Sequence, residues 1–401
     1  MSRPAAAEVR LARAWLSRAV EPGRPALYEF VSAVGPVEAV RRLRAGSAGD
    51  EVAALAEARR AQDRAADDLA EAARLGARLV TPEDDEWPDE ALRPIEIAFA
   101  REQAARRAQV LLDRDQVAMV PPLALWVVGG VRVDEALARA VAVVGSRTAT
   151  PYGEHVAADL GHGLAGRRWT VVSGGAYGID GAAHRGALAG SGLTVAVVAG
   201  GLAAPYPRGH AALFARIARD GLLMSEWPPD ATPQRHRFLV RNRLIAALTA
   251  GTVVVEAGVR SGALATGRQA LRVGRAVMAV PGPVTSAESA GVNRFLQDNA
   301  EVRLVTRAAD VVEMVGVIGE DLAPRDPAPP APRDGLDPIA LQVLDGLPTS
   351  GTASPDRIAV AAGVPPLDVL RCLPGLEARG LVDATPSGWC LTAAARGAGT
   401  R

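Results

Sequence analysis

The first 75 residues carry apolar side chains at intervals of three and four positions. The pattern runs through LARAWLSRAV, PVEAVRRLRAG and EVAALAEARRAQDRAADDLAEAARL, and no run alternates as a strand does. We therefore predict a helical domain over 1–75. A short strand, GARLV, follows, and then an acidic stretch over 83–90, which we interpret as a solvated loop.

From about Leu125 to Val315 the pattern changes to short apolar runs separated by helical segments. The candidate strands are almost continuously apolar, as parallel strands covered on both faces are. The spacing is that of βαβ units, which predicts an α/β fold with a doubly wound sheet over 76–320 and a core over 125–315. The strands are AVAVVGS, WTVVSGG, TVAVVAGG, LLMSE, GTVVVEAG, AVMAVPG and VRLVT.

The last part of the chain has a different composition. A proline-rich stretch, APRDPAPPAPRDGLDP, predicts an extended linker over 321–338. Beyond it, over 339–395, we expect three helices in PIALQVLDGL, SPDRIAVAAG and PLDVLRCLPGLEARG, followed by a β-hairpin in GLVDATPSGWCLT. Three helices and a terminal hairpin are typical of a winged-helix domain.

Composition restricts the classes of function. The 401 residues hold 45 basic and 45 acidic side chains, which excludes a globally basic nucleic-acid binder but not a local basic patch. Every basic residue is arginine, so no mechanism can depend on a lysine. Cys372 and Cys390 alone cannot build a disulfide framework or a zinc site. With no signal-peptide pattern and no long apolar run, we expect a cytoplasmic protein without a membrane partner, metal or cofactor.

Two glycine-rich loops follow predicted strands. Gly145, Ser146 and Arg147 supply a bare backbone, a hydroxyl and a planar cation suited to phosphate, although a plain turn with a surface arginine has the same pattern. Ser173 to Gly178 places three glycines and a serine between a strand and a helix, as anion-binding loops do. Its G-G-x-x-G spacing matches neither a dinucleotide fingerprint nor a Walker A loop.

Asp180 follows the second loop, where we expect it to cap the next helix. His184 lies four residues later on the same face, but two side chains are too few for a metal site.

An arginine cluster occupies 235–243, RHRFLVRNR, with no acidic residue in it. Arginines can neutralise phosphates while the ring of Phe238 stacks on a base. The alternative is that these arginines pair with carboxylates elsewhere in the fold. Glu226 and Glu256, at the ends of two predicted strands, are candidates for that pairing, and less so for hydrolysis.

A further strand-end loop ends in Ser261 and Gly262, which again place a hydroxyl and a bare backbone at the start of a helix. We find no plausible Ser-His-Asp set, no cysteine near a histidine and no HExxH motif. The loops together suggest an anionic, extended ligand at one edge of the sheet, and no catalysis.

Eight sequence blocks of this chain, in their order and spacing, resemble those of the bacterial DNA-processing protein A family, also called DprA or Smf. The blocks are AVAVVGSR, VVSGGAYGIDGAAHRGAL, GLTVAVVAGGLAAPYP, GLLMSEWPP, FLVRNRLIAALT, VVVEAGVRSGALAT, GRAVMAVPG and GVNRFLQDNA. The resemblance implies an extended Rossmann-like domain, with an N-terminal helical domain of the SAM or helix-hairpin-helix type and a C-terminal winged helix. It also implies a non-enzymatic homodimer that binds single-stranded DNA and loads the RecA recombinase onto it during natural transformation.

The same resemblance implies a DNA pocket. Three positions differ from the usual family residues, namely His210, Gly267 and Asn299, and 101–116 resembles an insertion. Arg208 falls where relatives often have lysine, and it keeps the charge while changing the geometry. The residues implied to contact DNA are Arg147, Ser173, Gly174, Gly175, Arg208, Arg241, Asn242, Arg243, Ser261 and Gly262. The loops and the arginine cluster described above add Gly145, Ser146, Gly178 and Phe238 as expected contacts.

Two other classes of function are weighed. Related Rossmann-like phosphoribohydrolases act on nucleoside monophosphates, but they carry a PGGxGTxxE signature where this chain has VVVEAGVRSGALAT. A transcription regulator would use the predicted winged helix, yet its third helix has two arginines offset by Asp368 and Glu377. Both observations favour a single-strand DNA binder with little sequence preference.

Overall fold

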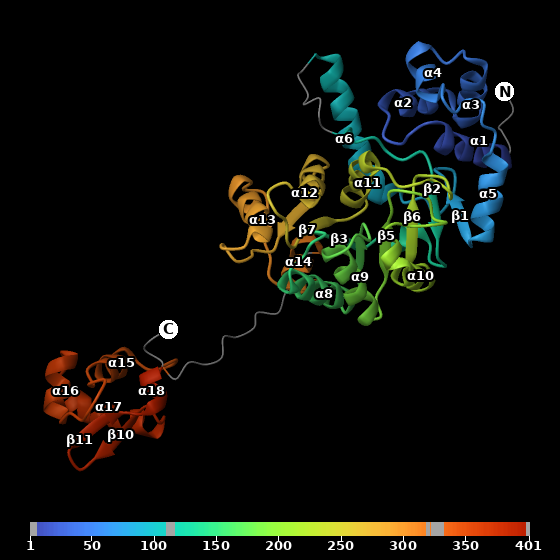
Figure 1. The fold of residues 1–401 in the computed structure, drawn as a ribbon. Coiled ribbons are helices and arrows are strands. Elements are labelled where there is room, and N and C mark those ends of the chain that lie inside the picture. The colour runs from blue at the N-terminus through green and yellow to red at the C-terminus, as the bar shows by residue number, and fades with distance from the viewer. Residues whose placement is uncertain (1–5, 110–116, 318–320, 322–332, 398–401) are drawn as a thin grey trace. The chain divides into compact units, whose positions relative to one another are not determined.

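The computed structural model describes residues 6–109, 117–317, 321 and 333–397 (Figure 1). The chain divides into two compact units, residues 1–323 and 324–401. The predicted linker over 321–338 falls largely outside the described residues.

The N-terminal region is helical, as its periodicity predicts. Its apolar faces close around Trp15, Leu16 and Leu43, and this cluster continues onto strands of the sheet through Leu79 and Trp126. The helices therefore pack on the sheet within the first unit. They are α1 (Ala6–Ala19), α2 (Pro25–Val34), α3 (Pro36–Ala45), α4 (Asp50–Ala56) and α5 (Ala65–Arg74).

A single mixed sheet organises the first unit, with nine strands in the described residues. Its order is β1-β2-β6-β5-β4-β3-β7-β8-β9, and all neighbours from β6 to β9 are parallel. The strand order reverses between β3 and β7, so this junction is the topological switch point. The strands are β1 (Ala77–Val80), β2 (Leu125–Val128), β3 (Ala140–Val144), β4 (Thr170–Ser173), β5 (Thr194–Val197), β6 (Leu222–Ser225), β7 (Gly251–Val254), β8 (Ala276–Ala279) and β9 (Arg303–Leu304).

Helices cover both faces of the sheet, which explains why the strands are apolar throughout (Figure 1). On one face lie α6 (Asp89–Arg107), α7 (Val133–Leu137), α11 (Arg235–Ala247), α12 (Gly262–Arg272) and α13 (Ala287–Asp298). On the other face lie α8 (Pro151–Ala165), α9 (Ile179–Ala189), α10 (Ala211–Asp220) and α14 (Ala308–Val315), and a 3-10 turn, η1 (Arg208–His210), precedes α10.

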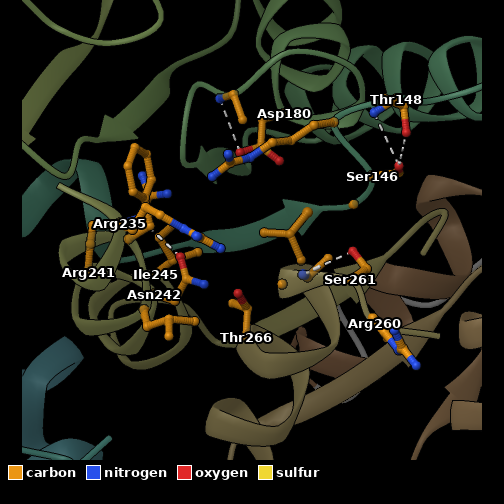
Figure 2. A pocket seen from close by; sticks show the side chains of 18 of the residues that line it. Ser146, Thr148, Asp180, Arg235, Arg241, Asn242, Ile245, Arg260, Ser261 and Thr266 are labelled. Carbon is orange, nitrogen blue, oxygen red and sulfur yellow. Dashed lines mark hydrogen bonds between the residues drawn. The ribbon is translucent and has the colours of Figure 1, made fainter. Parts of the chain in front are cut away.

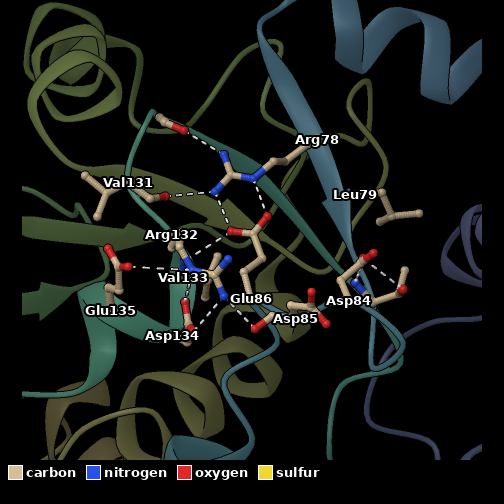
Figure 3. Close-up of polar contacts among 12 residues, drawn as sticks. Arg78, Leu79, Asp84, Asp85, Glu86, Val131, Arg132, Val133, Asp134 and Glu135 are labelled. Atoms are coloured by element: carbon tan, nitrogen blue, oxygen red, sulfur yellow. Dashed lines mark hydrogen bonds and ion pairs between the residues drawn. The ribbon is translucent and has the colours of Figure 1, made fainter.

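Two sequence interpretations need correction at the β1 edge. The strand β2 was not predicted, because its run lies in PPLALWVVGG, next to a proline pair and a glycine pair. It pairs antiparallel with both β1 and β6. The acidic stretch over 83–90 is not simply a solvated loop, since three of its carboxylates are ion-paired. Figure 3 shows Glu86 paired with Arg78, and Asp84 and Glu83 pair with arginines of α1.

The second unit contains α15 (Pro338–Asp345), α16 (Pro355–Ala362), α17 (Pro366–Ala378), β10 (Val382–Thr385), β11 (Gly388–Leu391) and α18 (Ala393–Gly397) in its described residues. The first three helices and the antiparallel hairpin were predicted, and α18 was not. Among the described residues, no single helix is long and apolar enough to cross a membrane. Helices α16 and α17 are long and apolar enough only when they are counted as one segment, and the chain bends by 105° between them.

Candidate functional site

The loops that follow β3 and β7 meet at the switch point of the sheet. Because β3 and β7 are parallel neighbours, their carboxyl ends lie side by side. The backbone N–H of Ser146 donates to the carbonyl of Glu256 at 2.6 Å, which joins the two loops. The Glu256 carboxylate is buried and accepts from the backbone N–H and hydroxyl of Thr150, at 2.8 and 2.9 Å. The loops are therefore fixed before any ligand binds.

The helix α11 completes this edge and presents two different faces. Arg235, Phe238 and Asn242 recur at helical spacing and line a pocket. Arg237 and Arg243 project to the other side, where they pair with Glu21 and Glu226. Helical periodicity thus divides the arginines of this cluster into two groups. One group faces the pocket, and the other forms ion pairs inside the fold.

The pocket between these elements has a volume of about 1000 Å³ and is lined by the loops after β3 and β7 and by α11 and α12 (Figure 2). Among its described lining residues, four arginines face one carboxylate, Asp180. A neutral chain therefore concentrates positive charge at the edge where α/β sheets bind ligands. The arginines are Arg147, Arg235, Arg241 and Arg260.

Cations and aromatic rings alternate on the α11 wall. The guanidinium carbon of Arg147 lies 4.9 Å from the ring centroid of Phe238, and that of Arg241 lies 5.9 Å from the same centroid. The ring of Tyr206 meets Phe238 edge-on at 5.9 Å. Such a wall offers a cation for phosphate next to an aromatic face for a base.

Arg241 lies deepest in this wall and is only 4% exposed. Its guanidinium donates to the carbonyls of Gly174 and Val197, and to the side chain of Asn242. Burial lowers the pKa of Arg241 to about 10, with a smaller contribution from Arg147, while Asp180 acts against the shift. Burial raises the pKa of Asp180, which Arg241 opposes. Arg241 is consequently both a structural residue and part of the pocket surface.

The glycine loop after β4 supports the pocket from behind. Ser173 is buried and donates its hydroxyl to the carbonyl of Val143. A Cβ on Gly174 would lie 2.6 Å from a guanidinium nitrogen of Arg241. Gly178 has a φ of +71°, and a Cβ there would lie 2.3 Å from the carbonyl oxygen of Ser146. These residues, with Gly175, were predicted to contact DNA, but in the structure they position the wall and do not line the pocket.

Three further predicted roles change. Asp180 does not cap α9, which begins at Ile179; it accepts from the backbone N–H groups of Gly174 and Ala176 and so closes the glycine loop. Arg243 is fully buried and forms a bidentate pair with Glu226, at 2.5 and 2.8 Å, so it is not accessible to DNA. Glu256 accepts from Thr150, and no arginine of the described residues pairs with it.

The remaining predicted residues divide by position. Gly145, Ser146, Arg147, Phe238, Asn242, Ser261 and Gly262 line the pocket together with Arg241. The Ser261 hydroxyl caps α12 by accepting from the backbone of Ala263, so a helix N-terminus opens into the pocket. Arg208 is exposed in η1 outside the lining residues.

Among the pocket residues that sequence reasoning missed are Arg260 and Tyr206. Both lie in sequence blocks quoted above, Arg260 directly before Ser261 and Tyr206 directly before Pro207. The signal available for Arg260 was an arginine next to a residue expected at the start of a helix. His184, in contrast, is buried away from the pocket and contacts Thr194 at 2.7 Å. Burial lowers the pKa of His184 to about 3, so the imidazole is neutral. Among the described residues no group of three or more His, Cys, Asp or Glu side chains could hold a metal.

A family model described as DNA recombination-mediator protein A matches residues 79–316, which include the whole pocket. The chain belongs to this family. A Mycobacterium tuberculosis protein assigned to the DprA proteins is 52% identical over 398 residues, covering 97% of this chain and 98% of its own. Protein Smf of Escherichia coli is 38% identical over 252 residues, covering 62% of this chain and 67% of its own.

Among solved structures, DprA from Streptococcus pneumoniae superposes with a TM-score of 0.61 at 26% identity. The match covers 79% of this chain and 100% of the other. The resemblance found in the sequence blocks is thereby confirmed. The family model spans the sheet and the pocket, whereas the Mycobacterium tuberculosis relative also matches the N-terminal helices and the second unit.

Proposed function

We propose that this protein binds single-stranded DNA in the pocket at the switch point and acts as a recombination mediator. In this proposal it is a cytoplasmic homodimer that loads a RecA recombinase onto the bound strand during DNA uptake, and it needs no cofactor. The observation that supports the proposal most is the pairing of Arg147 with Phe238, 4.9 Å apart, on the wall of an arginine-rich pocket. Guanidinium groups beside an aromatic ring suit a phosphate backbone with unstacked bases.

The carboxylates of the site favour binding over hydrolysis. A general acid or base must reach the reacting group, with an oxygen free to hold or take a proton. Both oxygens of Glu226 accept from Arg243, and both oxygens of Glu256 accept from Thr150. Asp180, the carboxylate that lines the pocket, accepts from the backbone N–H groups of Gly174 and Ala176 through one oxygen, Oδ2, so it is tied to the glycine loop. We infer that the pocket binds its ligand and does not hydrolyse it, since no second carboxylate stands among its described lining residues.

The flanking regions are assigned by the same reasoning. We propose that 1–75 is a helical domain that packs on the sheet domain over 76–320 within the first unit, and that the second unit is a winged helix. In that unit α17 exposes Leu367 and Leu370, while Arg371 lies 3.7 Å from Asp368. A recognition helix for duplex DNA would present several cations, whereas here the exposed Arg371 has an acidic neighbour. This composition supports the single strand as the preferred ligand.

Salt-dependent binding of an oligothymidylate tests the proposal at named residues. Arg147→Ala and Arg260→Ala remove exposed pocket cations, so each should weaken binding and reduce the slope of log affinity against log salt by roughly 0.7. Arg303→Ala, an exposed arginine of β9 outside the pocket, is the matched control and should leave the slope unchanged. Equal slopes for all four proteins would contradict the pocket assignment.

A further inference from the structure

The loop after β4 carries an exposed tyrosine beside the pocket. Tyr177 is 48% exposed, and it follows Ala176, which lines the pocket. One edge of its ring meets His210, with centroids 4.8 Å apart and planes at 71°. A Cβ on Gly209 would lie 2.4 Å from the Tyr177 hydroxyl oxygen. The ring is thus seated against η1 on one side and open on the other.

His210 holds this tyrosine in place. Its Nδ1 lies 3.0 Å from the carbonyl oxygen of Gly175, and a carbonyl can only accept, so the imidazole donates from Nδ1. A Cβ on Gly181 would lie 2.6 Å from the His210 ring, which shows how closely the imidazole packs on α9. His210 also contacts the ring of Phe214, at 6.2 Å between centroids. Tyr177 therefore rests on a side chain that is itself fixed on several sides.

Further exposed aromatic and cationic side chains belong to the segments around this tyrosine and the pocket. Tyr206 lines the pocket, is 49% exposed and contacts Phe238 inside it. Two residues later Arg208 is exposed in η1, next to the glycine on which Tyr177 packs. Arg185 of α9 is exposed close to Gly181. Proteins that bind single strands combine aromatic rings, which stack on bases, with cations, which contact the backbone.

We propose that Tyr177, seated on His210, is a stacking platform for a base of the single strand outside the pocket, and that Arg208 contacts the neighbouring phosphate. The inference rests on the proposed function, because the strand that reaches Tyr177 is the one the pocket holds. Arg208, which the family resemblance already implies as a DNA contact, stands outside the pocket lining, so the strand must extend beyond the pocket to reach it. The two side chains act differently, since a ring binds a base face and a guanidinium binds phosphate charge.

Oligothymidylates of increasing length test this platform in the full chain. Tyr177→Ala should bind short oligonucleotides that fill only the pocket as the wild type does, and should bind longer ones about fivefold or more weakly. Its salt slope should equal that of the wild type, whereas Arg208→Ala should lose roughly 0.7 from the slope with longer strands. Tyr177→Phe keeps the ring and should restore binding.

Tyr152→Ala is the matched control, because Tyr152 is also exposed but lies outside the pocket lining and donates its hydroxyl to Pro281. 2-Aminopurine placed at successive positions reports stacking directly, and its quenching outside the pocket should disappear in Tyr177→Ala. Long-strand affinity and quenching unchanged in Tyr177→Ala, with Arg147→Ala still weakened, would overturn the platform alone. If neither variant changes binding, or the wild type does not bind, the pocket proposal fails as well.

Discussion

Glu21 and Arg237 connect the N-terminal helices to the helix that forms the pocket wall. The carboxylate of Glu21, just after α1, accepts from two nitrogens of the Arg237 guanidinium at 2.6 and 3.0 Å. It also accepts from Trp227 at 3.0 Å and Arg59 at 2.8 Å. Because Arg237 belongs to α11, this carboxylate ties the helix that presents Phe238 to the end of α1.

Glu21→Ala should therefore lower both stability and DNA affinity. The change leaves Arg237 buried without its carboxylate, which costs about 2 kcal/mol after allowance for the partly exposed site. Urea unfolding measures the loss, and anisotropy with a single-stranded oligonucleotide measures the affinity. Glu57→Gln, at an exposed position after α4, is the control and should change neither. An unchanged DNA affinity in Glu21→Ala would show that the contact with the N-terminal helices does not influence the pocket.

The lowered pKa of Glu21 predicts that the stability of the protein depends on pH. Burial raises the pKa of Glu21, but the hydrogen bonds from Arg237, Trp227 and Arg59 outweigh burial and lower it from 4.5 to about 2. A folded-state pKa below the unfolded value stabilises the protein above pH 4.5, and this contribution is lost as the pH falls toward 2. The difference in unfolding free energy between the wild type and Glu21→Gln should shrink across that window. A difference independent of pH would refute the assignment.

Gly178 should be the least replaceable glycine of the pocket loops. Its φ of +71° and the 2.3 Å approach of a Cβ to the Ser146 carbonyl oxygen both exclude a side chain. Gly178→Ala should destabilise the first unit by about 1–3 kcal/mol. It should also weaken DNA binding, since the added methyl group pushes the loop after β4 away from the loop after β3. Gly262→Ala, where a Cβ meets nothing within 4 Å, should keep or slightly raise the melting temperature. Equal effects of the two changes would contradict this packing.

Arg243 and Arg147 should behave oppositely, although both were expected to bind DNA. Arg243→Ala leaves Glu226 buried and unpaired, which costs about 3–5 kcal/mol of stability. Arg147→Ala removes an exposed side chain and should leave stability within about 0.5 kcal/mol while weakening DNA binding. Thermal unfolding of both variants checks the contrast. If the Arg243→Ala protein is stable and its salt slope is reduced, Arg243 contacts DNA and its buried, structural role is wrong.

The sequence predicts most of the fold because parallel strands such as β3 and β7 are continuous apolar runs with turn signals at their ends. It fails for β2, whose four residues lie between a proline pair and a glycine pair. It also identifies the loops of the site but not the direction of each side chain. Arg241 and Arg243 are two residues apart in one motif, yet one reaches the pocket wall and the other is fully buried. Side chains two positions apart on a helix point to different sides, so the packing of α11 on the sheet decides which of the two reaches the pocket.

The central claim is that the pocket holds single-stranded DNA through its arginines. The most direct measurement is a salt-titrated binding assay that compares single- and double-stranded oligonucleotides of equal length on the wild-type chain. We predict clear preference for the single strand, with an affinity that falls steeply with salt and a slope that Arg147→Ala reduces. Equal affinity for both forms, or no binding to either, would contradict the claim.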